Sequence, residues 1–270
     1  MIQRLALIGY GAVAKDVLKA LTPLLTQHGV EVLILKRSAL SEAEERDLPS
    51  FAKVVKHPEE LWGFKADLII EAAGQEAVAQ YVPACLSSGA DVLITSIGAL
   101  VDSNLYSELL KIATQFNTRI LLPAGAVAGL DYLESIKNAE DLQVTYESRK
   151  PVSAWLPELE ALGLNPADIK EPFTLFEGSA EEAAQRYPQN LNVAATLALA
   201  GVGMKNTRVV VVVDPALHEN QHHVLVNSQY GEMRLQLSNT PSPDNPKTSW
   251  VVAQSVANVV KREFENIHFS

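Results

Sequence analysis

The sequence predicts an α/β fold in which a doubly wound parallel sheet is joined to a second α/β domain with a mixed or antiparallel sheet. Three observations lead to this prediction. The chain opens with an apolar strand, a glycine turn and an amphipathic helix. Apolar strand-like runs then alternate with helical patterns up to about residue 122, and strand patterns dominate beyond Pro123. A length of 270 residues is enough for two domains.

The first strand-turn-helix unit has the pattern of a nucleotide-binding turn. Residues 9–14 read Gly-Tyr-Gly-Ala-Val-Ala between an apolar run and a helix, which is the G-x-G-x-x-A fingerprint of a Rossmann-type domain. Gly9 allows a tight turn, Gly11 lets a pyrophosphate approach the backbone, and Ala14 allows close packing of helix on strand. We expect Gly9, Gly11, Ala12 and Val13 to contact a cofactor at the helix N-terminus. The alternative that this turn has only a structural role remains, because a G-x-G-x-x-A string by itself is common in sequences.

The remaining elements of the first domain follow in order. We expect strands at 31–35, 67–73, 92–97 and 119–122, a polar helix or loop at 41–46, a helix at 76–87 that Pro83 breaks or bends, and a helix at 104–116. In parallel sheets a ligand binds outside the carboxyl ends of the strands. Residues 36–38 and Ala73 lie at such ends and are therefore expected to contact the cofactor.

The second half of the chain predicts a different sheet. We expect strands at 143–148, 173–176, 208–213, 224–227 and 233–237, with helices at 130–136, 158–162 and 192–199. A last amphipathic helix is expected after residues 245–247, with Thr248 or Ser249 as its N-cap. We expect this helix, within 246–270, to pack against the first domain. The predicted domains are thus 1–122 with 246–270, which binds the dinucleotide, and 123–245, which carries the substrate site.

Composition limits the class of protein. The net charge of -10 argues against a nucleic-acid footprint, and the acidic cluster at 42–47 is interpreted as a solvated surface segment. Cys85 is the only cysteine, which excludes an intramolecular disulfide and a cysteine-based zinc site. The sequence has no signal-peptide pattern and no apolar run of about eighteen residues. We therefore expect a cytoplasmic protein without a membrane segment.

The end of the second strand suggests which dinucleotide binds. An Asp or Glu at this position favours the ribose 2′-hydroxyl of NAD, but this strand ends with Lys36, Arg37 and Ser38. The two basic side chains and the hydroxyl can pair with a 2′-phosphate. We expect NADP to be accepted and preferred over NAD. The alternative is that these are merely solvated residues at a strand end.

Two segments of the second domain carry candidate chemistry. Asn192 follows Asn190 at the start of a small-residue helix, where an amide acts as an N-cap or binds a nicotinamide carboxamide or ribose. Residues 218–223 contain three histidines, but no acid or cysteine cluster supports a metal site, and none is expected. Strand alternation places His222 on the face of Val224 and the adjacent His223 on the opposite face. A histidine is the natural acid–base group beside a hydride-transfer site.

Six ordered motifs together resemble the L-aspartate dehydrogenase family. They are G-x-G-x-x-A at 9–14, PAGA at 123–126 with GLD at 129–131, SRKP at 148–151, N-x-NVAA at 190–195, N-x-H at 220–222 and NPKTS at 245–249. The resemblance implies a homodimeric enzyme that uses NAD or NADP and interconverts L-aspartate with iminosuccinate, or with oxaloacetate and ammonia. It also implies a role in NAD biosynthesis. By motif, His222 resembles the catalytic histidine, and Ala126 and Asn192 resemble cofactor contacts.

The resemblance implies a mechanism with few protein groups. His222 acts as general base for water attacking the imino carbon, or as proton carrier in the reverse direction. Lys150, Arg149, Lys247 and Thr248 are candidates for holding the substrate carboxylates. Alternatives remain a related reductase, similar to dihydrodipicolinate reductase or homoserine dehydrogenase, and a non-catalytic NADP-sensing protein.

Overall fold

The computed structural model describes residues 2–187 and 192–267, with the side chains of Pro246 and Lys247 left out. The chain divides into two compact units, the first made of Met1–Gly125 with Ala253–Ser270 and the second of Ala126–Val252. We propose that these units are the two domains of the protein. The predicted fold class is confirmed, since the first unit holds a parallel sheet and the second a mixed one.

The first unit is built on a six-stranded sheet in the order β3-β2-β1-β4-β5-β6. All its strand pairs are parallel. The strands are β1 (Arg4–Ile8), β2 (Glu31–Leu35), β3 (Ala52–Val55), β4 (Leu68–Glu71), β5 (Asp91–Ile94) and β6 (Ile120–Leu121). The strand order reverses between β1 and β4, and ligands of such sheets bind outside the carboxyl ends at this switch point. The glycine turn predicted to hold a dinucleotide follows β1 directly.

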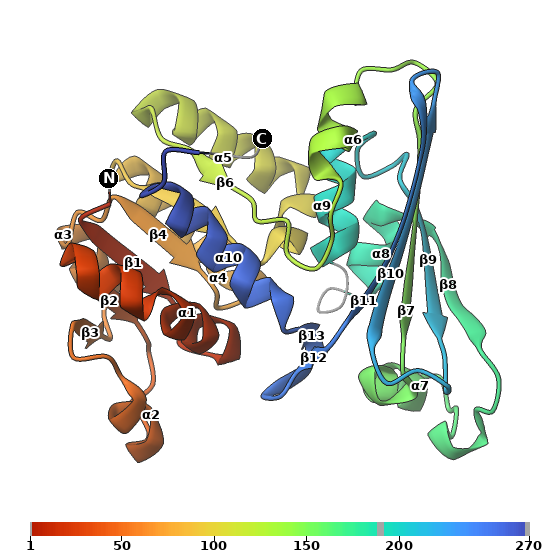
Figure 1. Ribbon diagram of the computed structural model, residues 1–270, viewed down its shortest axis with the longest axis horizontal. Helices are drawn as coiled ribbons and strands as arrows, with labels where there is room; N and C mark the ends of the chain where they lie inside the picture. Colours follow the sequence, from red (N-terminus) through yellow and green to blue (C-terminus); the bar gives the residue numbers. More distant parts are fainter. Residues whose placement is uncertain (1, 188–191, 268–270) are drawn as a thin grey trace. The chain divides into compact units, whose positions relative to one another are not determined.

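Helices cover both faces of this sheet (Figure 1). The helices that precede residue 125 are α1 (Ala12–His28), α2 (Glu42–Asp47), α3 (Pro58–Gly63), α4 (Gln75–Ser87) and α5 (Ser103–Phe116), with a 3-10 helix η1 (Ile97–Val101) after β5. Among them α2 buries no residue and lies away from the sheet. Strand β3 and helix α3 were not predicted, because a four-residue strand interrupted by Lys53 gives too short a pattern. The strand predicted at 92–97 ends earlier, at Ile94, and the chain then turns into η1.

Of the two outcomes predicted for Pro83, a break or a bend in its helix, the break was wrong. Helix α4 runs continuously from Gln75 to Ser87 with Pro83 inside it. A proline removes one hydrogen bond from a helix, and here Val82 and Leu86 on either side of it are fully buried. Burial of the apolar face therefore outweighs the local loss.

The second unit contains a five-stranded sheet in the order β11-β10-β7-β9-β8. Its strands are β7 (Gln143–Lys150), β8 (Phe173–Ser179), β9 (Arg208–Val213), β10 (Asn220–Ser228) and β11 (Gly231–Asn239), and its helices are α6 (Leu130–Ile136), α7 (Leu156–Ala161), α8 (Ala180–Arg186) and α9 (Asn192–Ala200), with 3-10 helices η2 (Val152–Trp155) and η3 (Pro166–Asp168). β7 and β9 are parallel, whereas β10 pairs antiparallel with both β7 and β11. One face of the sheet packs against the helices, and the hydrophobic core between them contains Tyr146, Val211 and Val224.

The C-terminal part of the chain differs in detail from the prediction. Residues 245–249 form strand β13 (Asn245–Ser249), which pairs with β12 (Pro241–Ser242), and helix α10 (Val251–Arg262) begins only afterwards. Thr248 and Ser249 therefore lie in a strand and do not cap the helix. α10 buries Ala253, Val256 and Val260 in the core cluster that also contains the apolar face of α1. In Figure 1, α10 and α1 lie side by side on one face of the first sheet.

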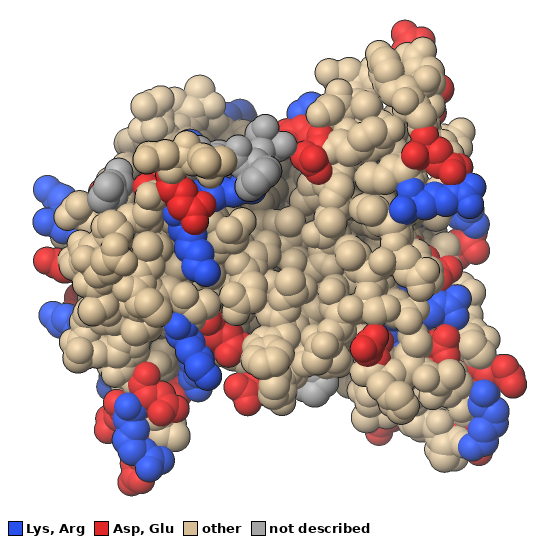
Figure 2. All heavy atoms as spheres, in the orientation of Figure 1, with Lys and Arg blue, Asp and Glu red and all other residues tan. Residues whose placement is uncertain are grey.

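The surface carries mixed charge. On the face drawn in Figure 2, basic and acidic side chains are interspersed over both units. Among the described residues, no helix is both long enough and apolar enough to cross a bilayer.

Candidate active site

The turn between β1 and α1 has the geometry that a dinucleotide requires. Gly9 adopts a φ of 95°, and a Cβ there would lie 2.8 Å from the Ala72 carbonyl oxygen, so only glycine fits. At Gly11 a Cβ would meet no atom within 4 Å, which leaves the backbone open to a ligand. Within the described chain, no side chain caps the first turn of α1, so its N–H groups can receive an anion. These residues fit the pyrophosphate of a dinucleotide.

A buried carboxylate organises the loop that contains Ala73. Glu71 is fully buried at the end of β4. Its Oε1 accepts hydrogen bonds from the N–H groups of Ala73 at 2.8 Å and Gly74 at 2.9 Å, and its Oε2 accepts one from the N–H of Ser96 at 3.0 Å. The Ser96 hydroxyl also donates to Oε1. Glu71 thus ties together the loops after β4 and β5, a role that sequence reasoning missed because an acid inside an apolar strand gave no distinguishing signal.

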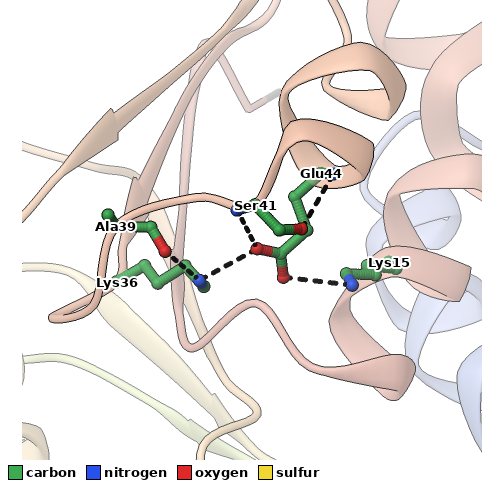
Figure 3. A network of polar contacts seen from close by, with 5 residues as sticks. All are labelled: Lys15, Lys36, Ala39, Ser41 and Glu44. Carbon is green, nitrogen blue, oxygen red and sulfur yellow. Dashed lines mark hydrogen bonds and ion pairs between the residues drawn. The ribbon is translucent and has the colours of Figure 1, made fainter.

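The end of β2 is less free than the sequence suggested. Lys36 Nζ lies 3.0 Å from Glu44 Oε2 and donates to the Ala39 carbonyl at 2.9 Å, while Lys15 Nζ lies 3.1 Å from Glu44 Oε1 (Figure 3). Arg37 and Ser38 are exposed. Residues 36–38, directly after β2, contain no acidic residue, but the fold places Glu44 of α2 beside this strand end. The interpretation of 42–47 as a wholly solvated segment was therefore wrong for Glu44.

The second unit holds the predicted histidine within a strand. Burial alternates along β10, with His222 buried and His223 half-buried, so His222 shares the helix-covered face with Val224 as predicted. The sequence placed residues 218–223 between strands, but β10 begins already at Asn220. In the register of β7 and β10, His222 stands opposite Ser148, and Tyr146 opposite Val224. Tyr146 and His222 are therefore diagonal neighbours on one face.

His222 is held by one hydrogen bond and is otherwise enclosed. Its Nδ1 lies 2.7 Å from the hydroxyl oxygen of Tyr146, and among the described residues its buried Nε2 has no hydrogen-bond partner. Burial, with smaller contributions from the nearby Lys150 and His223, lowers the pKa of His222 to about 3. The ring is consequently neutral near pH 7, with one nitrogen fixed and the other available for chemistry.

Lys150 is the basic group beside this histidine. Its side chain is buried at 4% exposure and its Nζ lies 5.7 Å from the centroid of the Trp155 ring. Arg149 alternates to the opposite face, where it lies 2.9 Å from Asp214 Oδ2 and 3.1 Å from Glu147 Oε1. Of these adjacent cations, the structure therefore brings only Lys150 to the face of His222.

His223 also belongs to the opposite face. Its Nδ1 lies 3.2 Å from Glu147 Oε1. The described residues hold no group of three or more histidine, cysteine, aspartate or glutamate side chains that could bind a metal ion.

The other predicted residues of the second unit occupy several places. Asn220 is buried and its amide lies 3.5 Å from the Ser249 hydroxyl, which joins β13 to the start of β10. The Thr248 hydroxyl accepts a hydrogen bond from the Asn245 amide at 3.1 Å. The side chain of Lys247 and the whole of Asn190 lie outside the described residues.

Two predicted cofactor contacts lie near chain turns of this unit. Ala126 is nearly buried and its carbonyl accepts a hydrogen bond from the Asn239 amide at 2.8 Å. Asn192 is the first residue of α9, and its carbonyl accepts a hydrogen bond from the Thr196 hydroxyl.

Comparison with known proteins decides the family. Residues 131–263 match the model of the aspartate dehydrogenase C-terminal domain, and residues 9–123 match the homoserine dehydrogenase NAD-binding domain. L-aspartate dehydrogenase 2 of Bordetella bronchiseptica is 49% identical over 266 residues, which cover 97% of both chains. The chain belongs to the L-aspartate dehydrogenase family. The resemblance inferred from the six motifs is thereby confirmed.

Other members of the L-aspartate dehydrogenase family agree with this assignment. The enzyme of Methanosarcina barkeri is 43% identical over 198 residues, or 73% of each chain. The crystal structure of aspartate dehydrogenase from Thermotoga maritima has a TM-score of 0.75 at 25% identity and covers 99% of both chains. An archaeal homoserine dehydrogenase bound to NADPH, at 14% identity and a TM-score of 0.56, shares the fold. His222 lies within residues 131–263, the segment that matches the aspartate dehydrogenase C-terminal domain.

Proposed function

We propose that this protein is an L-aspartate dehydrogenase that works with NAD or NADP. L-Aspartate and the oxidised dinucleotide give iminosuccinate, the reduced dinucleotide and a proton, and addition of water to the imine then gives oxaloacetate and ammonia. The reverse reaction is reductive amination of oxaloacetate. The observation that carries the proposal is His222, a neutral buried histidine inside the segment that matches the aspartate dehydrogenase C-terminal domain.

The first unit supports cofactor binding. The open backbone at Gly11 and the N–H groups of Ala12 and Val13 at the start of α1 are suited to the pyrophosphate, and Ala73 lies at the neighbouring strand end. Ala126 and Asn192 are proposed as further contacts from the motifs of the second unit. The bound dinucleotide supplies the hydride acceptor or donor.

The second unit supports the acid–base step. A neutral His222 can take a proton from the water that attacks the imino carbon, and it can return a proton in the reverse direction. Because Nδ1 is occupied by Tyr146, the reacting nitrogen is Nε2. Lys150, on the same face, is the cation best placed to hold a substrate carboxylate, and we propose Lys247 and Thr248 of β13 as further substrate contacts.

The basic end of β2 supports acceptance of NADP. Arg37 and Ser38 are exposed and can meet a 2′-phosphate with a guanidinium and a hydroxyl, and Lys36 can add a second cation when it leaves Glu44. A preference for NADP over NAD stays a prediction.

The second sheet also supports a homodimer. The face of this sheet opposite His222 carries half-buried side chains such as Thr145, Glu147 and Leu225, a mixture suited to contact with a second copy of the chain. We propose that this homodimer works in the cytoplasm and contributes to NAD biosynthesis.

One assay tests the function. The protein is mixed with NADPH or NADH, oxaloacetate and ammonium, and absorbance at the wavelength of the reduced nicotinamide is followed. Oxidation that requires all three components, together with formation of L-aspartate, supports the enzyme. Binding of the dinucleotide without turnover would instead support a cofactor sensor, and turnover without ammonium would indicate a different reductase.

A further inference from the structure

Three charged side chains from three elements meet beside the glycine turn. Lys15 comes from α1, Lys36 from the end of β2, and Glu44 from α2 (Figure 3). The carboxylate of Glu44 lies between the two ammonium groups, 3.1 Å from Lys15 Nζ and 3.0 Å from Lys36 Nζ. Lys15 Nζ also lies 5.5 Å from the centroid of the ring of Tyr10, a residue of the glycine fingerprint at 9–14. The cluster therefore belongs to the nucleotide-binding edge.

Glu44 is fixed in this position by the start of its own helix. Ser41 caps α2, and its N–H donates to Glu44 Oε2 at 2.9 Å while the Ser41 hydroxyl accepts from the Glu44 N–H. The Ser41 hydrogen bond, followed by those of Lys36 and Lys15, lowers the pKa of Glu44 to about 2. The carboxylate is thus ionised throughout the physiological range. Its neighbours Glu42 and Glu45 are exposed, whereas Glu44 is half-buried.

The location gives this carboxylate a consequence for cofactor choice. In this fold the end of the second strand meets the adenosine ribose, so a 2′-phosphate arrives beside Lys36. Both lysines attract that phosphate, but Glu44 already holds them and repels a second anion. A ribose with a free 2′-hydroxyl meets no such repulsion, and a carboxylate can accept its hydrogen bond.

We propose that Glu44 is the residue that sets the choice between NAD and NADP in this protein. It limits the affinity for NADP by neutralising Lys15 and Lys36, and the 2′-phosphate binds fully only when the carboxylate gives up the lysines. This inference rests on the proposed dinucleotide binding.

The test is direct binding of NADH and NADPH to the intact protein, measured by the fluorescence of the reduced nicotinamide. Glu44→Gln keeps the size of the side chain and an oxygen for the Ser41 N–H, but releases both lysines. We expect the ratio of the NADH Kd to the NADPH Kd to rise about tenfold, because one negative charge next to a phosphate dianion is removed. Lys36→Met in the Glu44→Gln background should then reverse most of this gain.

Glu45→Gln is the matched control, since it removes the same charge from the same helix at an exposed position. We expect it to change the ratio less than twofold. An unchanged ratio in Glu44→Gln, or an equal change in Glu45→Gln, would overturn the role of Glu44. If the unmodified protein bound neither dinucleotide, the proposed function itself would fail, which is a separate outcome.

Discussion

Tyr146 and His222 form a buried pair in which the phenol oxygen lies 2.7 Å from Nδ1 of the imidazole. For Nε2 to accept a proton, Nδ1 must carry the hydrogen and donate it to Tyr146. Burial raises the pKa of Tyr146, so the phenol stays neutral and the pair carries no charge before catalysis. Tyr146 therefore positions the ring and sets its tautomer.

Tyr146→Phe removes this acceptor without leaving a large cavity. We expect kcat to fall about tenfold to hundredfold, since the ring keeps its chemistry but loses its orientation. Dinucleotide Kd should stay within twofold, as measured by fluorescence titration. A kcat equal to that of the unmodified protein would show that the hydrogen bond only stabilises the fold.

His222→Ala tests the acid–base role itself. We expect turnover to fall by about 10² to 10⁴, with little change in dinucleotide Kd. His223→Ala is the control, because His223 lies on the opposite face beside Glu147. Loss of turnover in the His223 variant with retention in the His222 variant would exchange the two assignments.

Lys150→Met tests the cation on the catalytic face. A substrate carboxylate that loses its charged partner should bind more weakly, and we expect KM for oxaloacetate to rise at least about tenfold. Dinucleotide Kd serves as the internal control. An unchanged KM would place the carboxylates elsewhere, with Lys247 and Thr248 as the next variants.

Gly9 and Gly11 should respond differently to alanine. In Gly9→Ala the new Cβ meets the Ala72 carbonyl and the backbone keeps a φ of 95°, so we expect a loss of about 2 kcal/mol in the free energy of unfolding. Gly11 is extended with open space at its Cβ position, so Gly11→Ala should fold normally and weaken only dinucleotide binding. Urea unfolding and fluorescence titration separate the two effects. Equal stability of both variants would contradict the steric argument.

The lowered pKa of His222 predicts a pH dependence of stability. Below pH 6.5 the unfolded chain takes up a proton at this histidine, whereas the folded chain does not until about pH 3. His222 therefore does not reduce the free energy of unfolding above pH 6.5. Between pH 6.5 and about pH 3 it reduces this free energy by about 1.4 kcal/mol for each pH unit. Urea unfolding at pH 7 and pH 5 should show a smaller loss for His222→Asn than for the unmodified protein. Identical losses would mean that His222 is protonated in the folded state.

Sequence patterns predicted what depends on local periodicity. Alternation along β10 assigned His222 to the face of Val224 because side chains in a strand alternate with a period of two, and the structure shows that this face is buried. The glycine spacing at 9–14 predicted a tight turn, and the structure shows that only glycine fits at position 9 of this turn. Both features are determined within a few residues.

Features that depend on tertiary pairing were missed. Tyr146 meets His222 only because β7 and β10 pair in one particular register, which the patterns of two separate strands do not contain. Glu44 was placed in a solvated cluster because residues 42–47 are mostly charged. The capping of α2 by Ser41, which turns Glu44 toward Lys36, is visible only in the structure. The missing acid at the end of β2 was therefore supplied from the next helix.

The return of α10 to the core of the first unit constrains how the chain is made. A ribosome delivers residues in order, so all of 126–252 emerges before Ala253, Val256 and Val260 can join Leu5 and Leu7. During that interval the first sheet lacks the helix that covers part of one face, and its apolar side chains remain open to water or to a chaperone. Residues 126–252, the second unit, can form their own hydrophobic core before α10 joins the first unit. The first unit is therefore completed only after the whole second unit has been synthesised.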